Sequence, residues 1–159
     1  MRKNSRGFSL IELLIVVAII LIIAAIAIPN LLRSRIAANQ ASAVGSLRTL
    51  NTAEITYAST YNAGYSALLT NLAPPTTPTP TATAAGLIDS VLASGTKSGY
   101  TFSYSPGPVV GGRIDTYAIF ANPVTPGTTG TNYYFTDHSG VIRQDSAAQA
   151  SASSSPLAG

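Results

Sequence analysis

The stretch from Phe8 to Ile28 constrains this chain more than any other part of its sequence. It is 21 residues long, and only Ser9 and Glu12 within it are polar. As an α-helix it would extend for about 30 Å, which is enough to cross the hydrocarbon core of a bilayer. A carboxylate near the bilayer centre costs roughly 2.5 kcal/mol or more. Glu12 therefore needs a partner or a place close to the membrane interface.

The charges of the chain are few and unevenly distributed. Charged residues make up 9% of the 159 residues, and the formal net charge is +3. Three of the nine cations, Arg2, Lys3 and Arg6, precede Gly7, and without residues 1–7 six basic side chains balance six acidic ones. The basic character therefore belongs to the N-terminal segment and gives no support for nucleic-acid binding.

Two general interpretations of the apolar stretch are open. A secretory signal peptide would be cleaved after the small-x-small sequence Ala25-Ile26-Ala27. A plain membrane anchor would keep the three N-terminal cations inside the cell, although Arg33 and Arg35 follow the stretch closely. Neither interpretation explains why a carboxylate stands at position 12.

The sequence Gly7-Phe8-Ser9-Leu10-Ile11-Glu12, between a basic segment and an apolar run, resembles the prepilin signal of type IV pilins and type II secretion pseudopilins. The resemblance covers residues 6–30 and includes Pro29. It implies that a membrane peptidase cleaves on the cytoplasmic side after Gly7 and that Phe8 becomes the N-methylated N-terminus. It also implies that Glu12 is needed for this methylation and for assembly.

Glu12 has a physical role that does not depend on the resemblance. In a chain that begins at Phe8, the free amine and the Glu12 carboxylate are one helical turn apart, and the helix dipole favours a carboxylate there. Where many such helices pack together, Glu12 could instead pair with the cationic N-terminus of a neighbour and fix the axial stagger. A carboxylate solvated at the membrane interface is the plainer alternative.

A helical pattern continues beyond Pro29, whose missing N–H predicts a kink rather than an end. Apolar side chains then recur on one face at steps of 7, 4, 3, 7 and 4, at Ile36, Ala43, Leu47, Leu50, Tyr57 and Tyr61. From Tyr100 the period becomes two, which predicts strands at 100–105, 114–121, 132–136 and 141–143. We therefore predict an α+β fold, in which a long N-terminal helix packs on an antiparallel sheet of three to four strands, as a pilin-like roll.

The remaining stretches complete the predicted organisation. Residues 70–85 contain four prolines and six threonines, which predicts an exposed loop, and one or two helical turns follow at 87–92. The chain then divides into a basic leader at 1–7, which is removed, and a transmembrane and filament-core helix at 8–28. A globular domain at 29–145 and a disordered or loosely attached tail at 146–159 follow.

No catalytic arrangement is visible in the sequence. The chain has no cysteine, and its one histidine, His138, lies in a predicted turn. Neither a G-x-S-x-G sequence nor a phosphate-binding loop occurs. Some major pseudopilins bind calcium near their C-terminal loops, but Asp115, Asp137 and Asp145 are too widely spaced to predict such a site. We expect no enzyme, no metal and no cofactor.

The resemblance implies a structural subunit of a type IV pilus, serving adhesion, motility or DNA uptake. Its partners would be the prepilin peptidase/methyltransferase, an inner-membrane assembly platform and copies of itself in a helical polymer. The precursor would lie in the inner membrane, with its N-terminus cytoplasmic and its C-terminal domain outside the cytoplasm, and would reach the surface as a pilus. A type II secretion pseudopilin is the alternative, and a membrane-anchored or secreted binding domain is a further one. The absence of tryptophan and of an aspartate-rich C-terminal loop favours the pilin.

Overall fold

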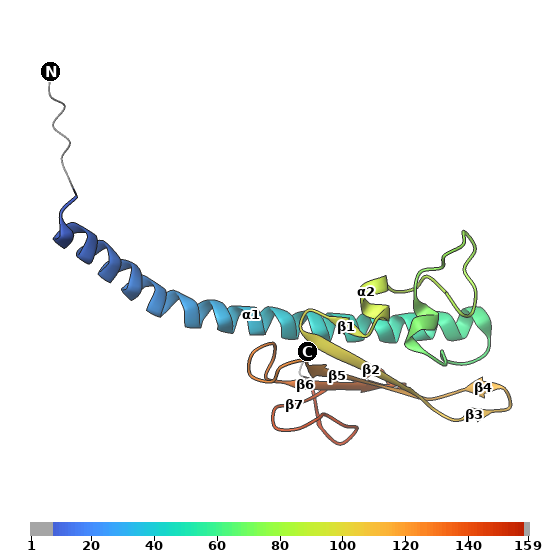
Figure 1. Cartoon of the computed structure of the whole chain (residues 1–159). Coiled ribbons are helices and arrows are strands. Elements are labelled where there is room, and N and C mark those ends of the chain that lie inside the picture. Colours follow the sequence, from blue (N-terminus) through green and yellow to red (C-terminus); the bar gives the residue numbers. More distant parts are fainter. Residues whose placement is uncertain (1–7, 158–159) are drawn as a thin grey trace. The chain divides into compact units, whose positions relative to one another are not determined.

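The computed structural model describes residues 8–157 of the chain, which form two compact units divided between Arg35 and Ile36. Helix α1 (Leu10–Tyr61) begins in the first unit and ends in the second. The second unit continues with the short helices η1 (Leu69–Leu72) and α2 (Ser90–Ala93), and then with eight strands among the described residues (Figure 1).

The strands form an antiparallel sheet in the order β1-β2-β5-β6-β7-β8 and a separate hairpin. The bounds in the sheet are β1 (Thr96–Lys97), β2 (Tyr100–Pro106), β5 (Tyr117–Pro123), β6 (Tyr133–Asp137), β7 (Arg143–Asp145) and β8 (Ser155–Pro156), and the hairpin consists of β3 (Val109–Val110) and β4 (Arg113–Ile114). The predicted α+β class is confirmed, but the sheet has six strands instead of three to four. The additional strands are only two residues long, which is too short for an alternating pattern to reveal them.

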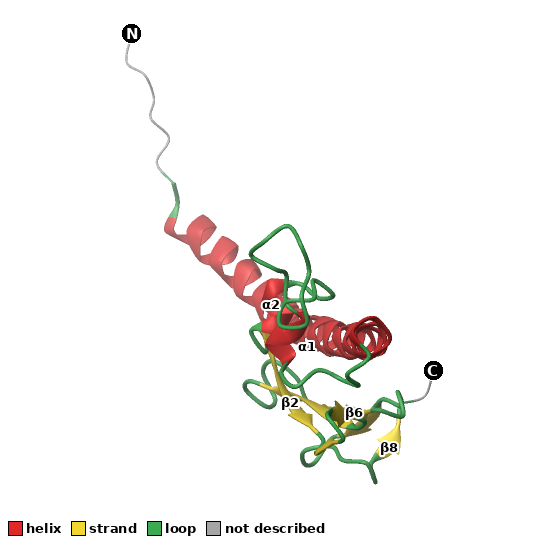
Figure 2. Cartoon of the chain, turned by 90° about the vertical axis from the view of Figure 1, so that its right-hand side faces the viewer, coloured by secondary structure: helices red, strands yellow, loops and turns green. Residues whose placement is uncertain are grey.

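Strands β2 and β5 pair over their whole length, from Tyr100 opposite Pro123 to Pro106 opposite Tyr117. Because side chains alternate along a strand, Tyr100, Phe102 and Tyr104 share one face of the sheet. This face lies along the C-terminal half of α1 in both views (Figures 1 and 2). Tyr100 and Phe102 are buried in the core between the helix and the sheet.

The helical half of the core follows the predicted apolar face of α1. Ala43, Leu47, Leu50 and Tyr57 are at most 5% exposed, whereas Ile36 and Tyr61 at the ends of the series are half-buried. The core is completed by side chains of η1, of α2 and of the sheet, among them Leu72, Leu92, Ile119 and Tyr134.

The loop between η1 and α2 agrees with its composition in part. Its threonines from Thr76 to Thr83 are exposed, as predicted. Leu72, at the end of η1, is fully buried, and the phenol of Tyr57 donates a hydrogen bond of 2.7 Å to the carbonyl of Ala82. The loop is therefore exposed along its proline-rich middle but attached to the core at both ends.

The C-terminal segment differs from the predicted disordered tail. Strand β8 pairs with β7, so that Ser155 lies opposite Gln144, and the Leu157 N–H donates a bond of 2.8 Å to the Ile142 carbonyl. Between the two strands, Ala150 has no exposed surface. The segment is held by backbone pairing, and its small polar side chains carry no pattern from which that pairing could be predicted.

Candidate assembly site

The first unit presents an uncovered apolar surface. Every residue from Phe8 to Arg35 is exposed, except Ala24, which is half-buried. Its large apolar side chains are between 46% and 79% exposed. Among the described helices, α1 is the one long and apolar enough to cross a membrane. Exposed apolar area costs about 25 cal/mol per Å² in water, so lipid or other protein must cover this surface.

Glu12 lies in the first turn of α1 and caps the N-terminus of the helix. Because the helix begins at Leu10, Ser9 is its N-cap and Glu12 its third residue. Glu12 Oε2 accepts a hydrogen bond of 2.9 Å from the backbone N–H of Ser9, which is one half of a capping box. The S-x-x-E spacing is the signal for this contact. The expectation from the sequence was a different pair, between Glu12 and the amine of Phe8.

The other predicted site residues lie around this turn or farther along the helix. Phe8 precedes α1, and its side chain is 77% exposed. Gly7 and the rest of the predicted leader lie outside the described residues, so cleavage after Gly7 and N-methylation of Phe8 stay predictions. Pro29 lies inside α1, which continues to Tyr61. The kink at Pro29 also stays a prediction.

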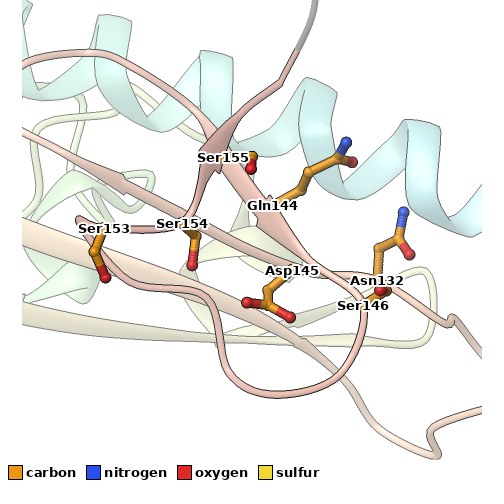
Figure 3. A pocket seen from close by; sticks show the side chains of 7 residues that line it. All are labelled: Asn132, Gln144, Asp145, Ser146, Ser153, Ser154 and Ser155. Atoms are coloured by element: carbon orange, nitrogen blue, oxygen red, sulfur yellow. The ribbon is translucent and has the colours of Figure 1, made fainter.

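A polar pocket of about 430 Å³ lies beside the C-terminal loop (Figure 3), lined by Asn132, Gln144, Asp145, Ser146, Ser153, Ser154 and Ser155. Its carboxylate is already engaged, because Asp145 Oδ1 accepts bonds of 2.9 and 3.3 Å from the N–H groups of Ala147 and Ala148. These bonds hold the pKa of Asp145 below its usual range. Asp145 therefore serves to hold the loop.

The described residues contain no group of three or more His, Asp or Glu side chains that could hold a metal ion. Asp137 ends strand β6 and His138 lies in the turn that follows, where Asp137 Oδ1 accepts a bond of 2.9 Å from the Ser139 N–H. Asp115 lies 3.4 Å from Arg113 Nε and is exposed. The structure thus does not bring these three residues together with Asp145 into one site.

A buried polar network under the sheet was not predicted. Asn51 Nδ2 donates a bond of 2.9 Å to Thr136 Oγ1, and Asn51 Oδ1 accepts one of 3.0 Å from the Tyr117 hydroxyl. Glu54, one turn farther along α1, is completely buried. Asn51 and Glu54 lie next to Leu47 and Leu50 on the core-facing side, and their position on an apolar face was the available signal.

Comparison with known proteins adds to this geometry. Residues 2–28 match the model of the prokaryotic N-terminal methylation motif. A segment of 37 residues, 23% of the chain, is 65% identical to the type IV wide pilus major component PilA4 of Thermus thermophilus. A segment of 51 residues, 32% of the chain, is 53% identical to the type IV major pilin protein PilA of Myxococcus xanthus. The chain is therefore similar to type IV pilins over part of its length, and it contains a prokaryotic N-terminal methylation motif.

These pilin matches are confined to part of each protein. They cover 28% of the Thermus protein and 23% of the Myxococcus protein. No solved structure matches the chain. Both pilin relatives are named as major pilus components. Glu12 and the exposed apolar side chains from Phe8 to Ile28 fall within the residues that match the methylation motif.

Proposed function

We propose that this chain is a structural subunit of a type IV pilus, held in a membrane as a precursor and then assembled with copies of itself into a helical filament. The observation that carries the proposal is the uncovered apolar surface that follows Glu12, within a segment that matches the N-terminal methylation motif. The same surface can lie against lipid before assembly and against neighbouring helices afterwards.

Processing would precede assembly. A prepilin peptidase removes residues 1–7 after Gly7, and Phe8 is then N-methylated. Phe8 lies outside the helix and is mostly exposed, so an enzyme can reach it without unwinding α1. The new amine lies four positions before Glu12 in the sequence, and the Ser9 N–H that donates a hydrogen bond to Glu12 is still present in the shortened chain.

Filament formation would transfer the segment from Leu13 to Ile28 out of lipid and into contact with other helices. Because lipid is already apolar, this transfer gains little hydrophobic free energy, and packing together with Glu12 pairing must specify the arrangement. Exposing the segment to water on the way would cost roughly 0.8 kcal/mol per methylene group. Extraction of the segment from the membrane therefore requires an inner-membrane platform that supplies the work. The second unit of the chain stays outside the cytoplasm throughout.

The test is the intact mass of the chain in material sheared from cells, compared with the mass in the membrane fraction. We expect sheared material to contain residues 8–159 with one added methyl group. The same mass found only in the membrane would favour a secretion pseudopilin. A chain that begins at Ile28, or one that retains Met1 in the membrane, would contradict the filament function.

A further inference from the structure

Glu54 fastens α1 to the segment that follows it. The side chain has no exposed surface, and neither has Ser66, which it contacts. Glu54 Oε2 accepts a bond of 2.8 Å from the Ser66 N–H, and Glu54 Oε1 lies 2.6 Å from Ser66 Oγ. The hydroxyl of Tyr104 in β2 donates a bond of 2.7 Å to the carbonyl of Ser66. The buried carboxyl group thus joins the helix to the segment 62–68, and Ser66 in turn joins that segment to the sheet.

The hydrogens available at this contact favour a carboxylic acid. Ser66 Oγ lies within hydrogen-bond distance of two acceptors, Glu54 Oε1 at 2.6 Å and the Leu68 carbonyl oxygen at 3.1 Å, but a serine hydroxyl has one hydrogen. With Glu54 ionised, the hydroxyl can donate to only one of them. A protonated Glu54 can itself donate to Ser66 Oγ, so that the hydroxyl is free to donate to Leu68 and both bonds form.

The surroundings of Glu54 also favour the neutral form. The ion pairs among the described residues join Lys97 to Asp89 and Arg113 to Asp115, so neither includes Glu54. The titratable groups that face it are tyrosines, namely Tyr57 on α1, Tyr104 on β2, and Tyr117 on β5 with Tyr65 packed against its ring. Burial raises the pKa of Glu54, and hydrogen bonds from Ser66 oppose part of that rise.

We propose that Glu54 is a buried proton-binding site, and that the bound proton tightens the attachment of residues 62–68 to α1. Loss of the proton leaves a buried carboxylate that contacts neither solvent nor a facing cation, and this burial costs free energy. The cost can be relieved only if residues 62–68 move and admit water. The proposal concerns the second unit alone, and it stands whether or not the chain forms filaments.

The segment held by Glu54 also supports the β3–β4 hairpin. The Tyr65 N–H donates a bond of 2.7 Å to the Ile114 carbonyl, and the Ile114 N–H donates one of 3.2 Å to the Ala63 carbonyl. Gly64 lies so close to Ile114 that an added Cβ would collide with the Ile114 backbone. Ionisation of Glu54 should therefore loosen residues 62–68 and the hairpin together.

The direction of the pH dependence follows from linkage. Because the pKa of Glu54 is higher in the folded than in the unfolded chain, folding takes up a proton. The stabilising contribution is fully present below the ordinary glutamate pKa, and it is lost as the pH rises through the raised pKa of the folded state. The attachment is therefore strongest below the ordinary glutamate pKa and weakens as the pH rises above it.

The test uses the full chain in detergent micelles. Glu12 and Glu54 are the only glutamates in the sequence, so selective ¹³C labelling at glutamate Cδ gives two signals, which a Glu54→Gln variant assigns. We expect the Glu54 signal to titrate at a higher pH than an ordinary glutamate. Amide exchange at Tyr65 and Ser66, corrected for the intrinsic rate, should lose protection between the ordinary glutamate pKa and the midpoint of this titration and level off above it. The loss should be roughly tenfold for each unit by which that midpoint is raised.

The Glu54→Gln variant is the matched control. Glutamine keeps one acceptor for the Ser66 N–H and one donor for Ser66 Oγ, and it does not titrate. Protection at Tyr65 and Ser66 should therefore stay constant in the variant over the same pH range. A Glu54 midpoint at the ordinary glutamate value in the unmodified chain would overturn the proposal. So would an equal loss of protection in the variant.

Discussion

Glu12 and Glu54 lie in the same helix, but the two halves of α1 that contain them differ in what covers their apolar side chains. Each carboxyl group accepts a backbone N–H, from Ser9 and from Ser66 respectively. After Glu12 the apolar side chains are exposed, whereas around Glu54 they are buried under the chain's own sheet. The half that contains Glu12 therefore depends on lipid or protein outside the chain to cover its apolar side chains, whereas the half that contains Glu54 is covered by the chain's own residues.

The largest expected effect is at Glu12 and concerns assembly. A Glu12→Val variant should still insert into the membrane and be cleaved. It should fail to build filaments when it is produced together with wild-type subunits. The measurement is the amount of the variant in the sheared fraction, with membrane insertion and cleavage followed in the same cells. Normal filaments formed by the valine variant alone would contradict the assembly role.

A Glu12→Gln variant separates the charge of Glu12 from its capping contact. Glutamine at this position can still accept the Ser9 N–H, as it does in capping boxes, but it has no charge to pair with an N-terminal amine. We expect the glutamine variant to lack filaments as the valine variant does. Normal filaments with glutamine and none with valine would mean that the cap, and not the charge, is needed.

The next effect compares apolar truncations in the two halves of α1. Leu50→Ala should lower the free energy of unfolding of the second unit by about 2–5 kcal/mol, because Leu50 is fully buried and the truncation leaves a cavity. Ile22→Ala should leave it unchanged, since Ile22 is 62% exposed. All eight tyrosines follow Ile36, so near-ultraviolet circular dichroism reports this unfolding selectively. Equal destabilisation by both truncations would contradict the division.

The smallest effect lies at the start of α2, on the surface of the second unit. Asp89 Oδ1 accepts a bond of 2.9 Å from the Leu92 N–H, and Asp89 Oδ2 lies 2.9 Å from Lys97 Nζ. Asp89→Ala should cost about 1 kcal/mol through loss of the cap. Lys97→Ala should cost less, since an exposed ion pair contributes about 0.2–1 kcal/mol. Urea unfolding of the two variants measures both effects. Because Asp89→Ala removes the ion pair as well as the cap, the contribution of the cap is the difference between the two variants, and equal effects would contradict a stabilising cap.

Features that depend on neighbouring residues can be predicted from the amino-acid order alone. Twenty-one residues with two polar side chains are enough to predict an apolar helix, and a prepilin-type signal is recognised from contiguous positions before and within it. The buried face of α1 at Leu47 and Leu50 and the strand from Tyr100 follow from periods of 3.6 and 2. The capping contact of Ser9 with Glu12 was also encoded locally.

Features that join residues far apart in the chain depend on the tertiary structure. Glu54 and Ser66 are twelve positions apart, and Asn51 and Thr136 are eighty-five apart. The pairing of β8 with β7 likewise depends on the course of the loop between them. A local period records which side of an element is apolar, but not which distant group lies opposite it. The partners of buried polar groups and the pairing of two-residue strands are therefore fixed only by the packing of segments that are distant in the sequence.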